Sequence, residues 1–292
     1  MSTNNRGLVE GKKFVATDLD GTLIPLDGHP KNERDLLALS HAVRENQFAM
    51  MFVTGRHFVS VIQKIKQFDL PIPEWIICDV GTSIYKLQPL LESSPENEIR
   101  FERTRDYAAE LKKLIGAYSA TILRDELASI PGIRLQEEEK QGHFKLSYYA
   151  YAQELDGSCK LIQAELNRNK LPWSIIASVD PFNGDGLIDL LPLGCSKAFA
   201  LDWLIRHMPF DESNIVYAGD SGNDFTALTS GLKAIVVANA DRELAQRVHD
   251  EHLQQNWKDR LFLATDQATS GVLQGCRRFG FLPQDTSDSL GS

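Results

Sequence analysis

Short runs of apolar and β-branched residues alternate along the chain with longer stretches in which apolar residues recur every three or four positions. The short runs predict buried strands, and the longer stretches predict amphipathic helices. The predicted strands cover residues 14–17, 48–53, 75–78, 215–218, 234–238 and 261–264. The predicted helices cover residues 32–45, 196–208, 224–230 and 242–249. Alternating strands and helices are typical of βαβ units, so we expect an α/β fold with a parallel, Rossmann-like sheet.

The middle of the chain has a different pattern. From residue 89 the sequence becomes charged and irregular, and residues 91–98 have the composition of a linker. Beyond it the pattern predicts a helix at 106–118, a β-hairpin around 140–142, a helix at 158–169 and a strand at 174–179. We therefore expect a discontinuous core, residues 1–88 and 189–292, with an inserted α+β domain at 89–188.

Charge and composition narrow the classes of function. The chain of 292 residues has 31 Lys and Arg against 40 Asp and Glu, a formal net charge of −9. This balance argues against nucleic-acid binding, which needs a basic face, but it leaves room for a small anion at a locally positive site. Residues 1–13 are polar, without the apolar segment of a signal peptide, and no apolar run approaches the ~20 residues that span a bilayer. We expect a cytoplasmic protein with no membrane contact, whose four cysteines, without metal-ligand spacing, are reduced thiols.

Two carboxylates, Asp18 and Asp20, follow the first predicted strand, with Gly21 and Thr22 directly after them. Ligands of α/β proteins bind beyond the carboxyl ends of the strands, where these side chains are expected. Two carboxylates at one point repel each other unless a proton or a cation separates them, and Mg²⁺ is a hard cation that prefers oxygen ligands. A structural turn in which the aspartates act as caps would have the same sequence.

Three further groups of polar residues stand at predicted strand ends or helix starts. Asp220 and Asp224 place two more carboxylates after the strand at 215–218. Thr54, Gly55 and Arg56 end the second strand and open a helix, where a hydroxyl and backbone N–H groups suit an anion; Arg56 is either a partner of that anion or a surface charge. Alone, each group also fits an ordinary turn or cap.

Lys197 is the fourth signal. It begins the predicted helix 196–208, where a cation is unfavourable for the helix dipole unless an anion lies nearby. In order along the chain, the four signals resemble the motifs of the haloacid dehalogenase superfamily of phosphohydrolases: DxDGT, a Ser or Thr after the second strand, a Lys, and GDxxND. The gap before Thr54 is short and the gap between Thr54 and Lys197 is long, an arrangement that in this superfamily implies a C2-type cap domain.

Three further segments, 79–85, 189–197 and 264–275, resemble the sucrose-phosphatase branch of the C2B-capped (type IIB) group. Two positions depart from that pattern. Ala198 follows the lysine where the capped group usually has Gly, and Gly21 precedes Thr22 where several sucrose phosphatases have Asn. Both departures leave the chemistry intact and concern the choice of substrate.

The resemblance implies roles for the carboxylates. Asp18 would be the nucleophile that forms an aspartyl-phosphate, and Asp20 would act as general acid and then as general base. Mg²⁺ would be held by the Asp18 carboxylate, the Asp20 backbone carbonyl and Asp220, with Asp224 in the same metal shell or orienting it.

The resemblance also implies a binding site for the phosphate and the sugar. Thr54, the Gly55 N–H and Lys197 would contact phosphoryl oxygens, and Asn223 would also face the substrate. His57 is expected near this site. The cap would supply polar groups that recognise the sugar, for which the candidates are Gln141, His143, Lys145, Ser147, Tyr149, Asp180, Asn183 and Asp185.

The expected function is thus that of a Mg²⁺-dependent phosphatase that acts on a glycosyl-sugar phosphate, and the leading candidate substrate is sucrose 6-phosphate. Mannosylfructose phosphate, glucosylglycerol phosphate and simple hexose phosphates are close alternatives as substrates. A phosphotransferase, which passes the phosphate from the aspartyl intermediate to a second sugar, would have the same site residues. A different class is a non-catalytic sugar-phosphate-binding domain that partners a glycosyl-phosphate synthase. Such a degenerate domain is expected to lose Asp18 or Asp20, and both are present.

Overall fold

The computed structural model describes residues 11–89, 99–179 and 183–284. Within them, eight strands form one sheet in the order β12-β11-β10-β1-β2-β3-β4-β5, and four form a second sheet. The strands of the first sheet are β1 (Phe14–Thr17), β2 (Ala49–Val53), β3 (Trp75–Cys78), β4 (Ser83–Leu87), β5 (Phe101–Arg103), β10 (Ile215–Gly219), β11 (Lys233–Val236) and β12 (Leu261–Leu263). The pairs from β12 to β3 are parallel, which confirms the predicted α/β fold with a Rossmann-like sheet.

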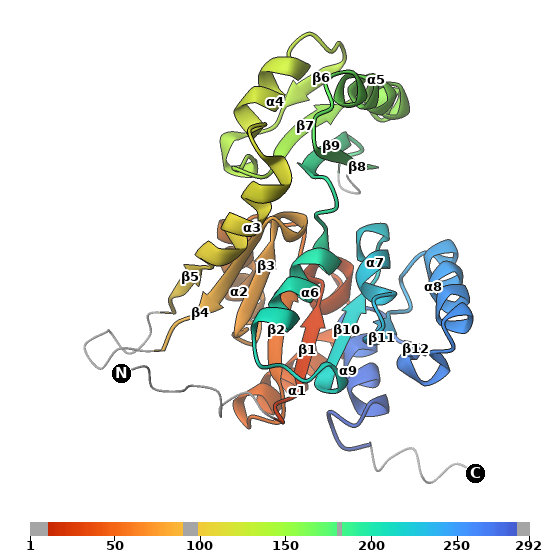
Figure 1. Ribbon diagram of the computed structural model, residues 1–292. Helices are drawn as coiled ribbons and strands as arrows, with labels where there is room; N and C mark the ends of the chain where they lie inside the picture. The colour runs from red at the N-terminus through yellow and green to blue at the C-terminus, as the bar shows by residue number, and fades with distance from the viewer. Residues whose placement is uncertain (1–10, 90–98, 180–182, 285–292) are drawn as a thin grey trace, which may run out of the picture.

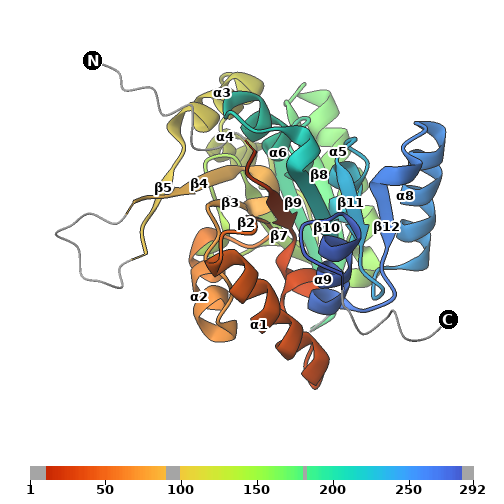
Figure 2. The ribbon, with the colours of Figure 1, turned by 90° about the horizontal axis from the view of Figure 1, so that it is seen from below.

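Helices cover both faces of the first sheet, so its central strands β10, β1 and β2 are buried at every position. Along β1, Phe14 and Ala16 pack into one hydrophobic cluster and Val15 into the other. The Val15 side is covered by α1 (Pro30–Arg44), α2 (Phe58–Phe68) and α9 (Ala268–Arg278). The opposite side is covered by α3 (Arg105–Ile115), α6 (Lys197–His207), α7 (Phe225–Leu228) and α8 (Arg242–Gln254). Figure 2 shows α1 and α2 on one side of the sheet and α3 and α6 on the other.

The second sheet is antiparallel, in the order β6-β7-β9-β8. Its elements are α4 (Ala120–Leu127), β6 (Ile133–Leu135), β7 (Leu146–Ala150), α5 (Leu155–Arg168), β8 (Trp173–Val179) and β9 (Gly186–Pro192). Leu146, Tyr148 and Ala150 pack under α4 and α5, while Ser147 and Tyr149 point to the other face. Figure 1 shows this unit standing over the first sheet. It lies beyond the carboxyl ends of the strands, where Lys145 contacts Asp79, the residue directly after β3.

The two sheets divide the chain at different residues from those predicted. β5 lies inside the predicted cap range of 89–188 but pairs with β4 in the first sheet. β9 runs across the predicted boundary at 189 and pairs with β7 and β8 in the second sheet. The linker expected at 91–98 lies outside the described residues. Short edge strands such as β5 carry too few apolar positions to mark their own sheet.

Two other details differ. The hairpin expected around 140–142 exists as the antiparallel pair β6–β7, but a ten-residue connection joins the strands. Within this connection the Gln141 side chain folds back and bonds to the backbone of Ser147 in β7. The helix α4 and the strands β4 and β9 were not predicted. No helix in the three described ranges has the length and apolar character that crossing a membrane requires.

Candidate active site

Three neighbouring strands bring the motif residues to one edge of the sheet. Asp18 follows β1, Thr54 follows β2 and Asp220 follows β10. In the register of the sheet, Thr17 at the end of β1 lies beside both Phe52 and Ala218. Parallel strands in register end at the same level, so residues far apart in the sequence meet here.

Lys197 joins this edge from the start of α6. Its side chain is fully buried, with Nζ 3.0 Å from Asp18 Oδ1 and 2.8 Å from Asp224 Oδ1. Ser196 caps the helix by accepting a hydrogen bond from the N–H of Phe199, and α6 therefore begins at Lys197. Burial alone would lower the pKa of Lys197, but Asp18 and Asp224 outweigh it and raise the pKa to about 12. The ammonium group is therefore a fixed positive charge in the site.

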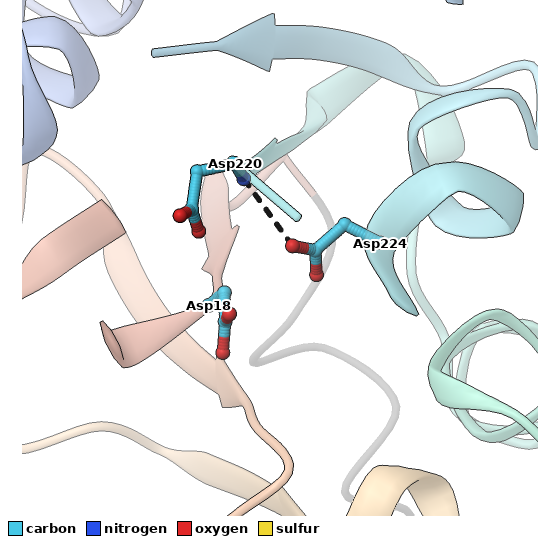
Figure 3. Close-up of side chains that lie close together, drawn as sticks. All are labelled: Asp18, Asp220 and Asp224. Carbon is cyan, nitrogen blue, oxygen red and sulfur yellow. Dashed lines mark hydrogen bonds between the residues drawn. The ribbon is translucent and has the colours of Figure 1, made fainter. Parts of the chain in front are cut away.

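The carboxylates of Asp18, Asp220 and Asp224 form a cluster, in which one oxygen of each lies within 4.8 Å of the others (Figure 3). Burial raises the pKa of Asp18 well above its ordinary value, and the charges of Asp224 and Asp220 add to this while Lys197 opposes it. Burial likewise raises the pKa of Asp220 to about 6, although the Thr22 hydroxyl donates to Asp220 Oδ1 at 2.6 Å and opposes the rise. A cation would relieve this crowding of negative charge.

Asp224 differs from the other two carboxylates because the protein's own donors already occupy it. Its Oδ1 accepts hydrogen bonds from Lys197 Nζ and from the Tyr217 hydroxyl at 2.5 Å. Its Oδ2 accepts from the backbone N–H groups of Asp220 and Ser221, at 3.2 and 3.1 Å. Asp224 thus holds both the lysine and the backbone of the loop that carries Asp220.

The Asp20 side chain lies apart from this cluster and is paired with Arg56. Arg56 Nε donates to Asp20 Oδ2 at 2.6 Å and Nη2 donates to Oδ1 at 2.7 Å, a bidentate arrangement. Asp20 remains half exposed, with 47% of its side chain accessible. The next residue, Gly21, has a left-handed backbone with φ of 72°, and a Cβ there would collide with the Asp220 carboxylate. The partner of Arg56 is thus the Asp20 carboxylate, which neither of the two alternatives for Arg56, a partner of the bound anion or a surface charge, had named.

The remaining predicted phosphate-binding residues lie on the flanking loops. Thr54 is fully buried, and its Oγ1 accepts a hydrogen bond from the Arg56 N–H at 3.2 Å. Gly55 stands between them and is partly exposed. Asn223 lies in the loop that connects Asp220 to Asp224, where its Oδ1 accepts from the Ser221 hydroxyl at 3.1 Å.

On the cap, Lys145 bridges the two parts of the molecule. It is buried, and its Nζ lies 3.6 Å from Asp79 Oδ1 of the core and 3.6 Å from Asp189 Oδ1 of β9. Ser147 donates to the same Asp189 oxygen at 2.5 Å. Asp79 and Asp189 were not named as site residues, although both stand in the segments that carried the family resemblance. Their pairing through Lys145 depends on how the cap sits over the core.

The other cap candidates are placed differently. The Gln141 amide is consumed in the cap itself, donating to the carbonyls of Gln136 and Ser147. Tyr149 donates to Glu137 and accepts from Lys140. Asn183 and Asp185 bond to each other on an exposed turn, and Asp180 lies outside the described residues.

A cavity of about 220 Å³ lies between the core and the cap, beside the Thr54–Arg56 loop. Its lining includes His57 and Asp79 from the core and Gln141 and His143 from the cap. His57 also caps α2, because its Nδ1 accepts from the Ser60 N–H. Burial lowers the pKa of His57, which favours the neutral ring. The structure thus brings His57 and His143 to one cavity, as polar groups able to meet a bound ligand.

Comparison with known proteins agrees with this geometry. The family model for sucrose-6F-phosphate phosphohydrolase matches residues 11–280. A putative HAD-like hydrolase of Nitrosococcus oceani is 34% identical over 92% of this chain and 72% of its own length. The mannosylfructose-phosphate phosphatase of Agrobacterium fabrum is 25% identical over 93% of this chain and 98% of its own. The probable sucrose-phosphatase 2 of Arabidopsis thaliana is 25% identical over 95% of this chain and 63% of its own.

Among solved structures, the sucrose-phosphatase of Synechocystis in complex with sucrose and phosphate superposes with a TM-score of 0.68. It shares 23% identity with this chain, and the match covers 93% of this chain and 99% of the other. The resemblance to capped haloacid dehalogenase phosphatases is therefore confirmed. The chain belongs to the sucrose-6F-phosphate phosphohydrolase family of the haloacid dehalogenase superfamily and is a phosphoric monoester hydrolase.

Proposed function

We propose that the protein is a Mg²⁺-dependent phosphatase that hydrolyses a glycosyl-sugar phosphate, and that its preferred substrate is sucrose 6-phosphate. One observation carries this proposal: the buried Lys197 ammonium is held between Asp18 and Asp224, next to Asp220. The arrangement offers one positive charge for a phosphate and a group of oxygens for a cation, with a carboxylate between them. These are the requirements of phosphoryl transfer to a carboxylate.

Asp18 is the nucleophile in this mechanism. Its oxygen forms a bond to phosphorus while the bond from phosphorus to the sugar oxygen breaks, and the sugar oxygen takes a proton from Asp20. Water then attacks the aspartyl-phosphate, gives a proton to Asp20 and releases inorganic phosphate and free Asp18. Because Asp20 is bound to Arg56 in the structure, this pair has to open before Asp20 reaches the sugar oxygen.

The donor set fits a hard divalent cation such as Mg²⁺, because it consists of carboxylate oxygens that lie within 4.8 Å of one another. Asp18 and Asp220 would hold the ion, together with the Asp20 backbone carbonyl. Asp224 would position Lys197 and the Asp220 loop, since both of its oxygens are already engaged. When bound, Mg²⁺ would neutralise charge on the transferring phosphoryl group.

The phosphoryl oxygens would be bound by Lys197, the Thr54 hydroxyl and the Gly55 N–H, with Asn223 contacting the substrate from the opposite loop. For the sugar, we propose Lys145 and Asp189 on the open face of the cap sheet, and Asp79 beneath them. These three charged groups are held close together at the junction of the two parts. Sugar hydroxyls would hydrogen-bond to these groups while the Lys145 ammonium stays beside the two carboxylates, so that the buried charges keep their partners.

Sucrose 6-phosphate is favoured by the family model and by the sucrose-phosphatase relatives. Mannosylfructose phosphate is the second candidate, because the relative with that activity in its name matches over 98% of its own length. A glucosylglycerol-phosphate synthase of Pseudomonas anguilliseptica is 27% identical over 92% of this chain but only 31% of its own. That match keeps glucosylglycerol phosphate, and partnership with such a synthase, among the alternatives.

The decisive experiment measures phosphate release from sucrose 6-phosphate, mannosylfructose phosphate, glucosylglycerol phosphate and simple hexose phosphates, with Mg²⁺ and with EDTA. A strong preference for sucrose 6-phosphate that requires Mg²⁺ would support the proposal. Preference for another glycosyl-sugar phosphate would replace the substrate and keep the mechanism. Low and equal rates on all substrates would contradict the assignment to disaccharide phosphates, and absence of release would favour the binding domain.

A further inference from the structure

Three consecutive residues after β3 have left-handed backbones: Asp79, Val80 and Gly81, with φ of 52°, 57° and 102°. A β-branched residue such as Val80 rarely adopts this conformation, which is strained for any residue other than glycine. Such a turn persists where its surroundings hold it in place.

The turn carries the backbone of the proposed phosphate-binding loop. The Asp79 N–H donates to the Arg56 carbonyl at 2.9 Å, and the Val80 N–H donates to the Thr54 carbonyl at 3.1 Å. On its other side, Gly81 packs against the Ser196 carbonyl so closely that a Cβ on Gly81 would collide with it. Ser196 directly precedes Lys197. The turn thus contacts both the loop of Thr54 and the start of the helix that bears Lys197.

Two donors converge on the carbonyl oxygen of Gly81, one from each segment that connects core and cap. Tyr107, on α3 where the chain leaves for the cap, donates its hydroxyl at 2.5 Å. Cys195, where the chain returns to the core, donates its thiol at 3.4 Å. Both side chains are buried, and burial raises the pKa of Tyr107 above its ordinary value and that of Cys195 to about 12, so both keep their protons.

The Tyr107 ring makes a second connection. It packs against Trp203 of α6, with ring centroids 5.0 Å apart, and lies 6.3 Å from the ring of Phe199 on the same helix. Tyr107 therefore contacts α6 through its ring and the turn through its hydroxyl. Helix α6 carries Lys197, and the turn contacts the loop of Thr54, so both contacts lead to residues that are proposed to bind phosphate. Tyr107 itself lies on α3, through which the chain leaves the core for the cap.

We propose that the Gly81 carbonyl is the point at which the two connections to the cap are tied to the phosphate site, and that Tyr107 is a positioning residue. By donating to Gly81, Tyr107 keeps the strained turn in place, and the turn keeps Thr54 and Lys197 at their separation. The inference rests on the proposed phosphate-binding roles of Thr54 and Lys197. It does not depend on which sugar is attached to the phosphate.

The test is the variant Tyr107→Phe, which keeps the ring packing and removes the hydroxyl that donates to the Gly81 carbonyl and lies 4.0 Å from Cys195 Sγ. The main readout is the binding of inorganic phosphate in the presence of Mg²⁺, which a ³¹P NMR titration measures. This readout needs no sugar. We expect weaker phosphate binding and a fall in kcat/KM of roughly 10- to 100-fold, as small displacements of positioned groups produce. The loss should be equal for all sugar phosphates that are hydrolysed, because their leaving groups do not contact Tyr107.

Tyr148→Phe is the matched control. Tyr148 is also buried, in the cap core, and the same single atom is removed. Its phosphate binding should equal that of the wild type, and urea unfolding of both variants shows any general loss of stability. Tyr107→Phe with a lower unfolding midpoint but wild-type phosphate binding would overturn the proposal, as would equal weakening in both variants.

Cys195 provides a second test, because it donates to the same oxygen. In the Tyr107→Phe background, Cys195→Ala should weaken phosphate binding further, whereas Cys195→Ser keeps a donor and should not. Identical binding by these two double variants would contradict the role of Gly81. If the wild type binds phosphate but hydrolyses no sugar phosphate, the proposed substrate is wrong, and the phosphate titrations still decide the role of Tyr107.

Discussion

Lys197 and Asp224 form an ion pair of 2.8 Å in which neither side chain is exposed to solvent. Burying two charges is costly, and the pair is stable only when its partners satisfy it fully. Here Asp18 provides a second contact to the lysine, and Tyr217 a further hydrogen bond to the aspartate. The pair therefore holds a positive charge directly beside Asp18, the proposed nucleophile.

Removing the lysine should destabilise the protein strongly. Lys197→Met leaves Asp18 and Asp224 buried without a counter-charge, and we expect a loss of about 3–5 kcal/mol in the free energy of unfolding. Urea denaturation of the metal-free protein measures it. Lys113→Met is the control, because Lys113 is exposed and pairs with Glu110 at the surface, and it should change stability by less than about 1 kcal/mol. Equal effects of the two substitutions would contradict the buried ion pair.

Asp18→Asn should abolish turnover, because an amide does not form the acyl-phosphate bond. The folded structure should survive, since asparagine has the same shape and removes one charge from a crowded cluster. Phosphate release under saturating Mg²⁺ is the measurement. Asp202→Asn, on the exposed side of α6 and paired with Arg206, should keep full activity. Substantial turnover by Asp18→Asn would exclude Asp18 as nucleophile.

The raised pKa of Asp220 predicts a pH dependence of stability in EDTA. Burial raises this pKa from its ordinary value of 3.8 to about 6, so between these values the folded protein keeps a proton that the unfolded chain releases. The free energy of unfolding should therefore fall as pH rises through this window. Asp220→Asn should flatten this part of the profile, and an unchanged slope would contradict the assignment.

The same carboxyl should govern the need for metal. Protonated Asp220 is a poor ligand, so the Mg²⁺ concentration required for half-maximal activity should increase as pH falls below about 6. EDTA should stop phosphate release, and added Mg²⁺ should restore it. A Mg²⁺ requirement that does not change between pH 5 and 7 would place the ion away from Asp220.

Lys145 is expected to act on the sugar rather than on the phosphate. Lys145→Met leaves Asp79 and Asp189 facing each other across the junction of core and cap. We expect KM for the preferred sugar phosphate to rise by roughly tenfold, the effect of losing one charged contact, while the dissociation constant for inorganic phosphate stays the same. Lys160→Met, on an exposed position of α5, is the control. A parallel loss of phosphate binding would place Lys145 at the phosphate.

The cysteines should differ in reactivity. Cys78, Cys195 and Cys276 are buried, whereas Cys159 on α5 is partly accessible. Burial raises the pKa of Cys195 and Cys276 to about 12, which keeps both as unreactive thiols. In the folded protein a thiol reagent should therefore modify Cys159 first, and Cys159→Ser should remove this phase. Rapid labelling of a second cysteine without denaturant would show that the core opens.

The grouping of the candidate active-site residues followed from local sequence patterns. Asp18, Thr54 and Asp220 each follow a buried strand, and strands joined by helices run parallel, so their carboxyl ends meet. Lys197 could be added because a cation at a helix start needs an anion nearby. These arguments use only the order of the elements and the direction of the strands, which a chain encodes within short stretches.

Contacts that depend on the relative placement of elements could not be obtained in this way. The Asp20–Arg56 pair joins residues of two loops, one after β1 and one after β2, and depends on how these loops lie against each other. The bridge from Lys145 to Asp79 depends on how the cap stands over the core, and the boundaries near β5 and β9 depend on which sheet each strand joins. Local patterns carry no information on such long-range pairings, because backbone hydrogen bonds are alike in every strand and the choice between partners is made by packing.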